Sequence, residues 1–260
     1  FVMDLELKGR VALVTGSYRG TGAGIAKRLA EEGVKVIVHG FEEGQTDAIV
    51  SELADTGKFV SALELDPRKL SKTELNNRLP EIDILVNNYG TPAGSNWDTM
   101  ENWALEWEEN VMIGVRFTQA VMAGMKSREW GRILFLGTIG INRPSSHSPG
   151  YYGSKAALQP IIRSLAVELR GTGITVNMIN PGLIATQEVK KMIEKRASAD
   201  GVTGNWEELV EWATTHFMPT LTGGISTPES IGEIVSFLAS ERAAQINGAV
   251  IPVDGGWQYA

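Results

Sequence analysis

The sequence predicts an α/β fold, in which a single doubly wound domain is built on a parallel β-sheet of about seven strands. Three observations lead to this prediction. Short runs of apolar residues recur along the chain, as they do in strands that are buried on both faces. Segments typical of helices separate these runs, and strands alternating with helices form parallel βαβ units with right-handed crossovers. No linker or shift in composition divides residues 1–260, so we treat them as one domain.

The individual elements follow from these runs in chain order. In the first half we expect strands over residues 11–14, 34–38, 60–65 and 82–86, and helices over residues 25–32 and 48–54. In the second half we expect strands over residues 133–136, 174–179 and 250–253, and longer helices over residues 103–125 and 153–169. Residues 187–227 break the alternation, and we treat them as a variable segment of the same domain.

The composition excludes several functional classes. A formal net charge of −7 argues against the basic surface that nucleic-acid binding requires. The chain shows neither a signal peptide nor a run of about 18 uncharged apolar residues, so we expect a soluble cytoplasmic protein without a membrane partner. It has no cysteine, which excludes disulfides and thiolate nucleophiles. Its three histidines lack the close spacing of a metal motif, so we expect no metal site.

A glycine-rich turn lies between the first strand and the first helix, with glycines at positions 16, 20 and 22. Glycine lets a pyrophosphate approach the backbone, and the following helix offers unpaired N–H groups and the positive end of its dipole. The turn therefore predicts a Rossmann-type dinucleotide site. Its Gly-x-x-x-Gly-x-Gly spacing differs from the standard fingerprint, and a turn without a ligand is the alternative. The expected phosphate contacts are Gly16, Ser17, Arg19, Gly20, Thr21 and Gly22.

The end of the second strand bears on which cofactor binds. An acidic residue there would bond the ribose 2′-hydroxyl of NAD and reject a 2′-phosphate, but the chain has His39 followed by Gly40. Arg19, in the glycine-rich turn, could pair with a 2′-phosphate. We therefore favour NADP(H) and expect His39 to contact it. NAD(H) is the alternative, because Glu42 and Glu43 lie just beyond.

Tyr151 and Lys155 are four residues apart at the start of a predicted helix, so they share one face of it. A phenol with a pKa of about 10 is a poor proton donor or acceptor at neutral pH unless its pKa is shifted. A neighbouring ammonium favours the phenolate and lowers the pKa of the phenol. The pair therefore indicates acid–base chemistry, although the same spacing also arises by chance on helix surfaces.

Together with residues elsewhere, this pair makes the chain resemble the short-chain dehydrogenase/reductase family over nearly its whole length. The matching residues occur in the family's order: Thr15-Gly16…Gly20…Gly22, Asp66, Asn87-Asn88…Gly90, Asn110, Tyr151…Lys155, Asn180-Pro181-Gly182…Thr186 and Asp254-Gly255-Gly256. Each motif alone is modest in specificity, whereas all of them in order are strongly indicative. The resemblance implies an oxidoreductase that interconverts a carbonyl and an alcohol with a nicotinamide cofactor.

The resemblance assigns catalytic roles to four residues. Tyr151 would exchange a proton with the substrate oxygen, and Lys155 would lower the pKa of Tyr151 and hold the nicotinamide ribose. Asn110 would help order a water that links Lys155 to solvent. The family's serine is replaced by Thr138, whose hydroxyl offers the same donor and acceptor beside an extra methyl group.

The resemblance also implies further cofactor contacts. Asp66 would contact the adenine, although it could equally be a helix N-cap before Pro67. Asn88 and Gly90 would lie near the ribose, in a turn where Tyr89 replaces the family's alanine. The carboxamide face of the nicotinamide would be held by Pro181, Gly182, Ile184 and Thr186.

Small carbonyl or alcohol compounds are the expected substrates. Trp206 and Trp212, in the variable segment, suggest an apolar pocket, and packing in a core or interface is the alternative. His147 would face the substrate, or else be a polar loop residue. By analogy with the family we expect a homotetramer.

Two other functions compete with the reductase. A dinucleotide-binding sensor or scaffold without turnover is the main alternative, because Thr138 and Tyr89 depart from the family's pattern. An epimerase or an enoyl reductase of the same fold is the third. Enoyl reductases space their tyrosine and lysine more widely than Tyr151 and Lys155, which counts against them.

Overall fold

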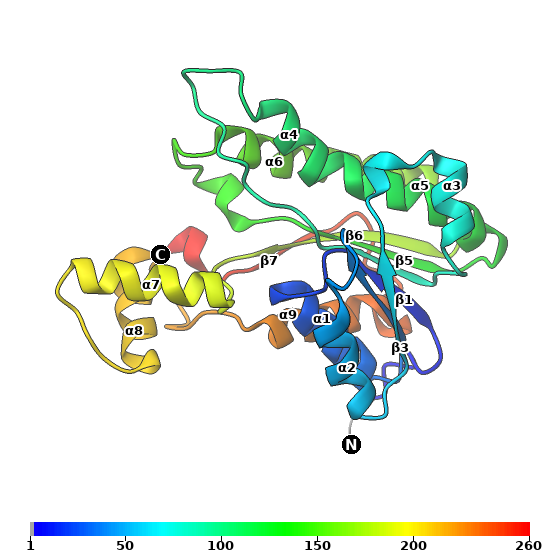
Figure 1. Cartoon of the computed structure of the whole chain (residues 1–260), viewed down its shortest axis with the longest axis horizontal. Coiled ribbons are helices and arrows are strands. Elements are labelled where there is room, and N and C mark those ends of the chain that lie inside the picture. The colour runs from blue at the N-terminus through cyan, green and yellow to red at the C-terminus, as the bar shows by residue number, and fades with distance from the viewer. Residues whose placement is uncertain (1–2) are drawn as a thin grey trace.

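In a computed structural model of the protein, which describes residues 3–260, a seven-stranded parallel sheet forms the centre (Figure 1). Its strands are β1 (Val11–Val14), β2 (Lys35–Gly40), β3 (Val60–Glu64), β4 (Ile84–Asn87), β5 (Gly131–Leu136), β6 (Ile174–Pro181) and β7 (Val250–Val253). They are ordered β3-β2-β1-β4-β5-β6-β7 with parallel pairing throughout, which confirms the predicted doubly wound fold. The order reverses between β1 and β4, where open α/β sheets form their binding crevice.

Helices cover both faces of the sheet (Figure 1). One face carries α1 (Gly20–Glu31), α2 (Asp47–Asp55) and α9 (Pro228–Ala239). The other carries α3 (Lys72–Arg78), α4 (Trp103–Trp107), α5 (Ile113–Ser127) and α6 (Pro149–Glu168). Short 3₁₀ turns cover Pro67–Lys69, Ile139–Asn142, Glu241–Ala243 and Trp257–Tyr259, and π-helical turns cover Glu108–Met112 and Ala213–Phe217.

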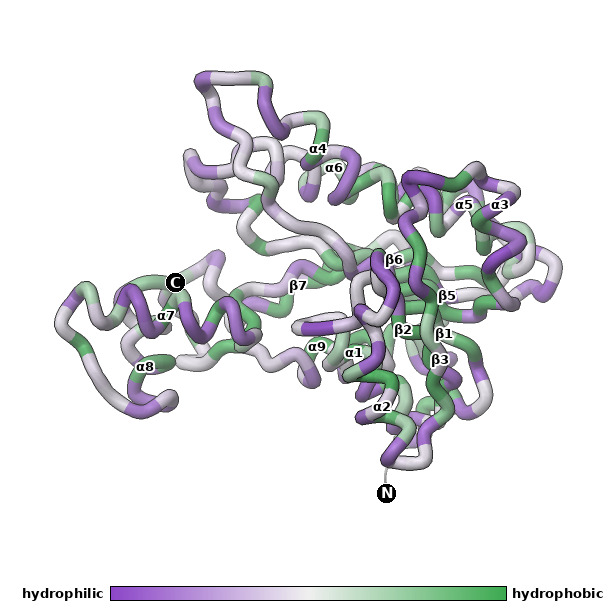
Figure 2. The backbone as a smooth tube through the Cα atoms, in the orientation of Figure 1, coloured by the Kyte–Doolittle hydropathy of each residue, from purple (hydrophilic) through white to green (hydrophobic). Residues whose placement is uncertain are grey.

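The side chains of the strands alternate between two cores. Leu13 of β1 belongs to the same core as Phe117 of α5 and Ile162 of α6, whereas its neighbours Ala12 and Val14 belong to the core under α1 and α9. All five side chains are buried. Because both faces of the sheet are covered, the strands are mostly apolar, as the green colouring of much of the sheet in Figure 2 shows. Continuous apolar runs therefore suffice to locate the strands.

Several helices differ from the prediction. α1 begins at Gly20 rather than at residue 25, because the glycine-rich turn supplies its first turn. The sequence does not predict α3, which is largely polar and buries only Leu75, nor α9 in the C-terminal part of the chain. The helix expected over residues 103–125 is one helical run in which the π-helical turn Glu108–Met112 separates α4 from α5. The ends of the other helices and strands differ from the predicted ends by a few residues.

The variable segment over residues 187–227 forms a lobe beside the carboxyl edge of the sheet, at the left of Figure 1. It contains α7 (Gln187–Ala199) and α8 (Trp206–Trp212). Ile193 and Ala197 of α7 share a small core with Leu209 of α8. The lobe therefore has an apolar centre of its own, apart from the two cores of the sheet.

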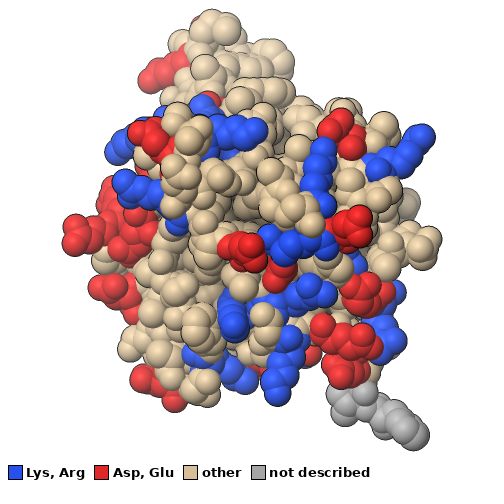
Figure 3. All heavy atoms as spheres, turned by 90° about the vertical axis from the view of Figure 1, so that its right-hand side faces the viewer, with Lys and Arg blue, Asp and Glu red and all other residues tan. Residues whose placement is uncertain are grey.

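Charged side chains of both signs are mixed on the face of the molecule that Figure 3 shows. On the face seen from the right-hand side of Figure 1, acidic and basic side chains lie close to one another, and neither sign forms one continuous patch (Figure 3). Between residues 3 and 260, no helix has the length and apolar character needed to cross a bilayer.

His39 holds the carboxyl ends of three strands together beneath the glycine-rich turn. Its ring is fully buried, and Nδ1 accepts a hydrogen bond of 3.1 Å from the Gly16 amide. Nε2 lies 3.0 Å from the Leu65 carbonyl, which can only accept, so Nε2 carries the proton and the ring is neutral. Burial is the main cause that lowers the pKa of His39, to about 4.

Ser17, which like His39 is a predicted cofactor contact, lies in the same buried network. Ser17 is also fully buried, and its hydroxyl donates to the Val14 carbonyl at 2.7 Å and accepts from the His39 amide at 3.0 Å. Buried polar side chains satisfy their hydrogen bonds within the protein. Both residues therefore shape the glycine-rich turn from below instead of facing its open side.

Replacing His39 with glutamine should make the free energy of unfolding fall less steeply as the pH is lowered below neutral. The unfolded chain binds a proton on His39 below about pH 6.5, whereas the folded protein binds it only below about pH 4. The stability contributed by the neutral ring is therefore complete above pH 6.5 and is lost as the pH falls toward about 4. We expect a loss of up to about 3 kcal/mol in the free energy of unfolding through His39. Urea denaturation between about pH 7.5 and 4.5 measures it.

The control for this experiment is His216→Gln, because His216 is exposed. The wild type and His216→Gln should lose stability with the same slope, and His39→Gln should lose less. If all three slopes coincide, a neutral His39 does not contribute to the fold.

Candidate active site

A cleft of about 580 Å³ opens at the carboxyl ends of β1, β4, β5 and β6, where the strand order reverses. Of the residues predicted for the site, it brings together Gly16, Arg19, Gly20, Thr21, Gly22, Asn88, Gly90, Thr138, Tyr151, Lys155, Pro181, Gly182, Ile184 and Thr186. The sequence analysis missed other lining residues, namely Tyr18, Thr91, Pro92, Leu136, Gly137, Leu183, Glu188 and Val189. Four of them, Tyr18, Thr91, Gly137 and Leu183, lie next to a predicted residue in the sequence, and the other four carry no such signal.

The glycine-rich turn leaves the amino end of α1 open to the cleft. Gly16 and Gly20 have φ angles of +62° and +56°, in the left-handed region that favours glycine. Gly22 lies against Asn88, and a Cβ at Gly22 would be 2.6 Å from Asn88 Nδ2. Arg19 occupies the N-cap without capping an amide through its side chain. The amides of the first turn are therefore available to an anion.

Arg19 reaches across the mouth of the cleft to the variable segment. Its Nη1 lies 3.1 Å from Oε1 of Glu188, at the start of α7, and both side chains are more than half exposed. An exposed ion pair of this kind contributes little to stability. A bound anion can therefore compete with Glu188 for Arg19 at low cost.

Tyr151 and Lys155 lie one turn apart on α6 and line the same cleft. Lys155 is buried, and its Nζ donates a hydrogen bond of 2.8 Å to the Leu136 carbonyl at the end of β5. Thr138 lies just beyond β5, and its hydroxyl interacts with the Tyr151 phenol in a way that lowers the pKa of this phenol. Gly90 makes room for the lysine, because a Cβ at this position would be only 2.5 Å from Lys155 Nζ.

Burial shifts the pKa values of both groups toward their neutral forms. It is the main cause that raises the pKa of Tyr151 to about 12, and the neighbouring Tyr152 adds to it while the Thr138 hydroxyl opposes it. It lowers the pKa of Lys155 to about 8. Lys155 is not among the main causes of the Tyr151 shift, and its lowering of the Tyr151 pKa stays a prediction. The ammonium is directed to the Leu136 carbonyl, and burial of the phenol dominates.

Asn110 lies in the π-helical turn between α4 and α5. Its Nδ2 donates to the carbonyls of Thr91 and Glu106, at 3.0 and 2.9 Å. Its Oδ1 is buried and has no partner among the described residues, and a Cβ at Gly90 would approach it as closely as 2.6 Å. Gly90 borders both Asn110 Oδ1 and Lys155 Nζ. The unpaired Oδ1 therefore lies on the side of Asn110 where a water that links it to Lys155 is expected.

Tyr89 lines the cleft beside the glycine-rich turn. Its ring lies over Gly16, where an added Cβ would meet Cδ2 at 2.9 Å, and packs on Phe41 with ring centroids 4.4 Å apart. Asp66 is not part of the cleft lining; its carboxylate caps the following 3₁₀ turn and is bonded by Arg68. The N-cap alternative therefore describes the Asp66 side chain, and its contact with adenine stays a prediction.

The structure does not bring the three predicted substrate contacts Trp206, Trp212 and His147 into the lining of the cleft. Trp206 and Trp212 pack on the small core of the lobe, and the ammonium of Lys190 lies 5.3 Å from the Trp206 ring. His147 is exposed, and its amide donates to the Ser145 hydroxyl at 3.2 Å. A small lobe needs large apolar side chains to form a core, so its tryptophans turn inward and not toward the cleft.

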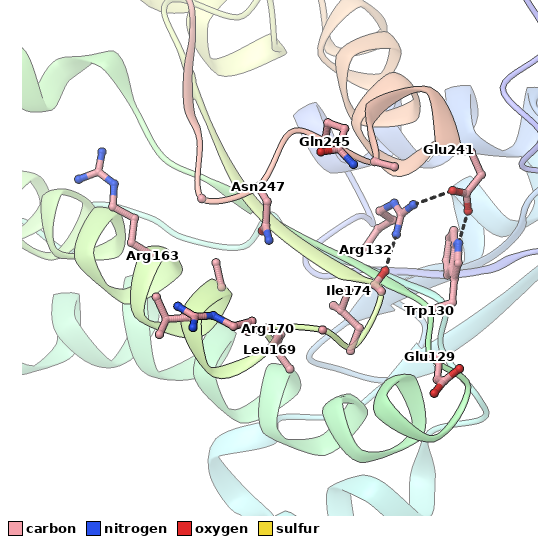
Figure 4. Close-up of a pocket in the computed structure, with 16 residues that line it drawn as sticks. Glu129, Trp130, Arg132, Arg163, Leu169, Arg170, Ile174, Glu241, Gln245 and Asn247 are labelled. Carbon is pink, nitrogen blue, oxygen red and sulfur yellow. Dashed lines mark hydrogen bonds and ion pairs between the residues drawn. The ribbon is translucent and has the colours of Figure 1, made fainter.

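A larger cavity, of about 820 Å³, lies at the opposite edge of the sheet, near the amino ends of β5 and β6 (Figure 4). Arg132 on its wall is buried and pairs with Glu241 at 3.3 Å, while Arg163 and Arg170 are exposed. Its lining includes none of the predicted site residues. We identify the smaller cleft as the candidate active site, because it gathers an acid–base pair and an anion site.

Comparison with known proteins relates the chain to oxidoreductases. The family model described as short chain dehydrogenase matches residues 10–197. The chain is 34% identical to an uncharacterised oxidoreductase of Bacillus subtilis, over 98% of each chain. It is 33% identical to the D-β-hydroxybutyrate dehydrogenase of Cupriavidus necator, over 96% of this chain and 98% of that protein. The L-sorbose reductase of Gluconobacter frateurii, solved with NADPH and L-sorbose, superimposes with a TM-score of 0.88 and 30% identity, covering 99% of this chain and 100% of that one.

Removing the buried ammonium of Lys155 should stabilise the fold. The pKa of Lys155 falls from 10.5 to about 8 on folding. The buried ammonium therefore lowers the free energy of unfolding fully below pH 8, and this destabilisation disappears as the pH rises toward 10.5. We expect Lys155→Met, which keeps the length of the side chain without its charge, to raise the free energy of unfolding by about 1–3 kcal/mol near neutral pH. Urea denaturation measures the difference.

Lys69→Met is the matched control, because 81% of the Lys69 side chain is exposed. It should leave the free energy of unfolding almost unchanged. A Lys155→Met variant no more stable than the wild type would show that the ammonium is well solvated in the fold.

Proposed function

The chain belongs to the short-chain dehydrogenase/reductase family, and from this premise we propose that it is an NADPH-dependent reductase of a ketone. It is an oxidoreductase that acts on CH–OH or C=O groups with a nicotinamide cofactor. The observation that carries the proposal is the position of Tyr151, which shares one cleft with the open amino end of α1. A proton donor and a site for a dinucleotide are thereby brought together.

The residues of the cleft fit a nicotinamide dinucleotide. The amides at the start of α1 would hold the pyrophosphate, which approaches the backbone closely because Gly16, Gly20 and Gly22 have no side chains. Lys155 would hold the nicotinamide ribose, and residues 181–186 would hold the carboxamide. When bound, the nicotinamide supplies the hydride that reduces the carbonyl carbon.

Tyr151 is the proton donor in this proposal. A pKa of about 12 keeps its phenol protonated at neutral pH, which suits transfer of a proton to the carbonyl oxygen. The hydroxyls of Tyr151 and Thr138 together meet the negative charge that develops on this oxygen. Lys155, with a pKa of about 8, is mostly protonated at neutral pH and stabilises the phenolate that remains. Asn110 would order the water through which the proton is replaced.

Two features support a preference for NADP(H). At Gly40, the end of β2, a Cβ would meet Gln45 Oε1 at 2.9 Å, and this oxygen is held by the Phe41 amide at 2.6 Å. The acidic side chain that selects NAD therefore does not fit at Gly40 unless Gln45 moves. Arg19 offers a guanidinium for a 2′-phosphate, in competition with its exposed partner Glu188.

The alternative function is a dinucleotide sensor without turnover, and an activity panel separates the two. The panel comprises acetoacetate, ethyl acetoacetate and L-sorbose, each with NADPH and NADH, because the relatives named above act on hydroxybutyrate and bind sorbose. The reductase should oxidise NADPH with at least one carbonyl, and faster than NADH. Tight binding of NADPH without turnover of any carbonyl would support the sensor.

We further propose that the protein is a cytoplasmic homotetramer. Exposed apolar side chains on and before α4, namely Trp97, Met100, Leu105 and Trp107, support an assembly in which a second copy covers them. Sedimentation equilibrium should give four times the mass of one chain, and a monomer would contradict this assembly.

Replacing Tyr151 with phenylalanine should abolish turnover while NADPH still binds. The variant lacks the proton donor but keeps the ring, so kcat should fall by about 10²- to 10⁴-fold with an unchanged Kd for NADPH. Thr138→Ala, which removes the second hydroxyl, should lower kcat by about 10²-fold, and Thr138→Ser should keep most of the activity. Steady-state kinetics measure kcat, and fluorescence titration measures the Kd for NADPH. Normal turnover in Tyr151→Phe would remove Tyr151 from the mechanism.

Replacing Tyr89 with alanine should tighten the binding of NADPH. The ring covers Gly16 and packs on Phe41, so an adenosine that enters must displace an aromatic contact of about 0.5–1.5 kcal/mol. We therefore expect a Kd about two- to tenfold lower for NADPH in Tyr89→Ala. Tyr89→Phe retains the ring and should resemble the wild type.

Reduced nicotinamide mononucleotide is the control ligand for Tyr89, because it lacks the adenosine. It should bind the wild type and Tyr89→Ala equally. Weaker binding of NADPH to Tyr89→Ala would show instead that the tyrosine ring stacks on the adenosine.

A further inference from the structure

Glu106, on the short helix α4, is a fully buried acid that the proposed mechanism does not use. Burying a carboxylate is costly unless hydrogen bonds replace the water that it loses. Oε1 of Glu106 accepts from the amides of Ala93, Gly94 and Ser95, at 2.8, 3.1 and 3.3 Å. Oε2 accepts a hydrogen bond of 2.5 Å from the Ser95 hydroxyl. In all four contacts the side chain is the acceptor, as an ionised carboxylate requires.

These contacts join Glu106 to the helix that carries Tyr151. While the Ser95 hydroxyl donates to Glu106, it accepts a hydrogen bond of 2.9 Å from the Gly150 amide in the first turn of α6. The residue at the N-cap of α6, Ser148, is in the left-handed region and makes no side-chain cap. Ser95 therefore caps α6 from another part of the chain, and Glu106 orients its hydroxyl.

Gly150 permits the close approach of the carboxylate. A Cβ at this position would lie 2.4 Å from Glu106 Oε2 and 3.0 Å from Ser95 Oγ, so a larger residue would push the acid away. The next residue is Tyr151. A negative charge at the amino end of α6 is favourable for the helix dipole. The same charge opposes ionisation of Tyr151, where it adds to the larger effect of burial in raising the pKa of the phenol.

Glu106 also fixes the wall of the cleft before α4. Thr91 and Pro92 line the cleft, and the loop then continues to the three amides that bond to Glu106. Asn110, one helical turn after Glu106, holds the carbonyl of Thr91. The two side chains therefore hold successive parts of one loop, and Glu106 connects this loop to the start of α6.

From these contacts we infer that Glu106 is a positioning residue, which fixes Tyr151 in the cleft and tunes how readily its phenol ionises. The inference rests on the proposed function of Tyr151. Among the described residues, the titratable groups that face Tyr151 are Tyr152 and Lys155 on α6 and Glu106 on α4, and Thr138 adds an uncharged hydroxyl. Glu106 is thus the acid through which the fold can set the acidity of the phenol.

Two substitutions separate the charge of Glu106 from its link to α6, and a third is the control. Glu106→Gln keeps the shape and removes the charge. Ser95→Ala keeps the charge and removes the link to Gly150. Glu101→Gln, the matched control, removes an exposed carboxylate from the segment just before α4.

The readout is the pH profile of kcat/KM for alcohol oxidation with NADP⁺. The alcohol is 3-hydroxybutyrate, ethyl 3-hydroxybutyrate or the reduction product of L-sorbose, matched to the panel ketone that turns over. In this direction Tyr151 accepts the proton, so the rate rises with the fraction of phenolate.

We expect Glu106→Gln to move this profile to lower pH by about half a unit, with a lower limiting kcat. Ser95→Ala should lower kcat by about tenfold without moving the profile, because the charge remains while the cap of α6 is lost. Glu101→Gln should change neither quantity.

The outcomes distinguish this inference from the proposed function. An unshifted profile for Glu106→Gln overturns the inference and leaves the role of Tyr151 intact. A wild-type rate that does not rise with pH, or no turnover in the panel, contradicts the proposed function instead. Should Glu106→Gln fail to fold, Ser95→Ala decides, because full kcat in that variant overturns the positioning role.

Discussion

The buried ammonium of Lys155 is the constraint on which the rest of the site depends. An ammonium removed from water needs acceptors and space, and a single chain segment does not supply both. Here the acceptor is the Leu136 carbonyl at the end of β5, and the space lies beside Gly90 after β4 and Asn110 between α4 and α5. The lysine is therefore accommodated only when these elements are assembled, so forming the fold and forming the site are one event.

Burial acts in the same direction on the titratable groups at this edge of the sheet. It raises the pKa of Tyr151 and lowers those of Lys155 and His39, so each is pushed toward its neutral form. Glu106 is buried as deeply, but four hydrogen bonds replace its water. The edge thus combines weakly solvated groups that can exchange protons with one acid that is held in place, which is the division of labour that an acid–base site requires.

The sequence could predict the features that depend on local pattern. The strands are apolar runs because both faces of the sheet are covered, and the spacing of Tyr151 and Lys155 places them on one face of a helix. Features that depend on distant contacts could not be predicted from local pattern. His39 follows the strand pattern of a cofactor contact but is satisfied from below, and Trp206 serves a core of its own lobe. Glu106 has no local signal at all, because its partners lie in residues 93–95.

The two ends of the cleft differ in how firmly the fold sets them. At the end of the cleft that contains Tyr151, helices and strands hold the buried groups in place. Residue types that match those of the family are therefore enough to specify the chemistry at this end. At the other end the half-buried Tyr89 lies over Gly16 and packs on Phe41, where the family has an alanine. A side chain that occupies part of a binding site lowers the apparent affinity by the fraction of time it does so, without altering the chemical step. Family membership therefore specifies the class of reaction of this protein, whereas our prediction for its affinity for the dinucleotide rests on Tyr89, which the family motif does not contain.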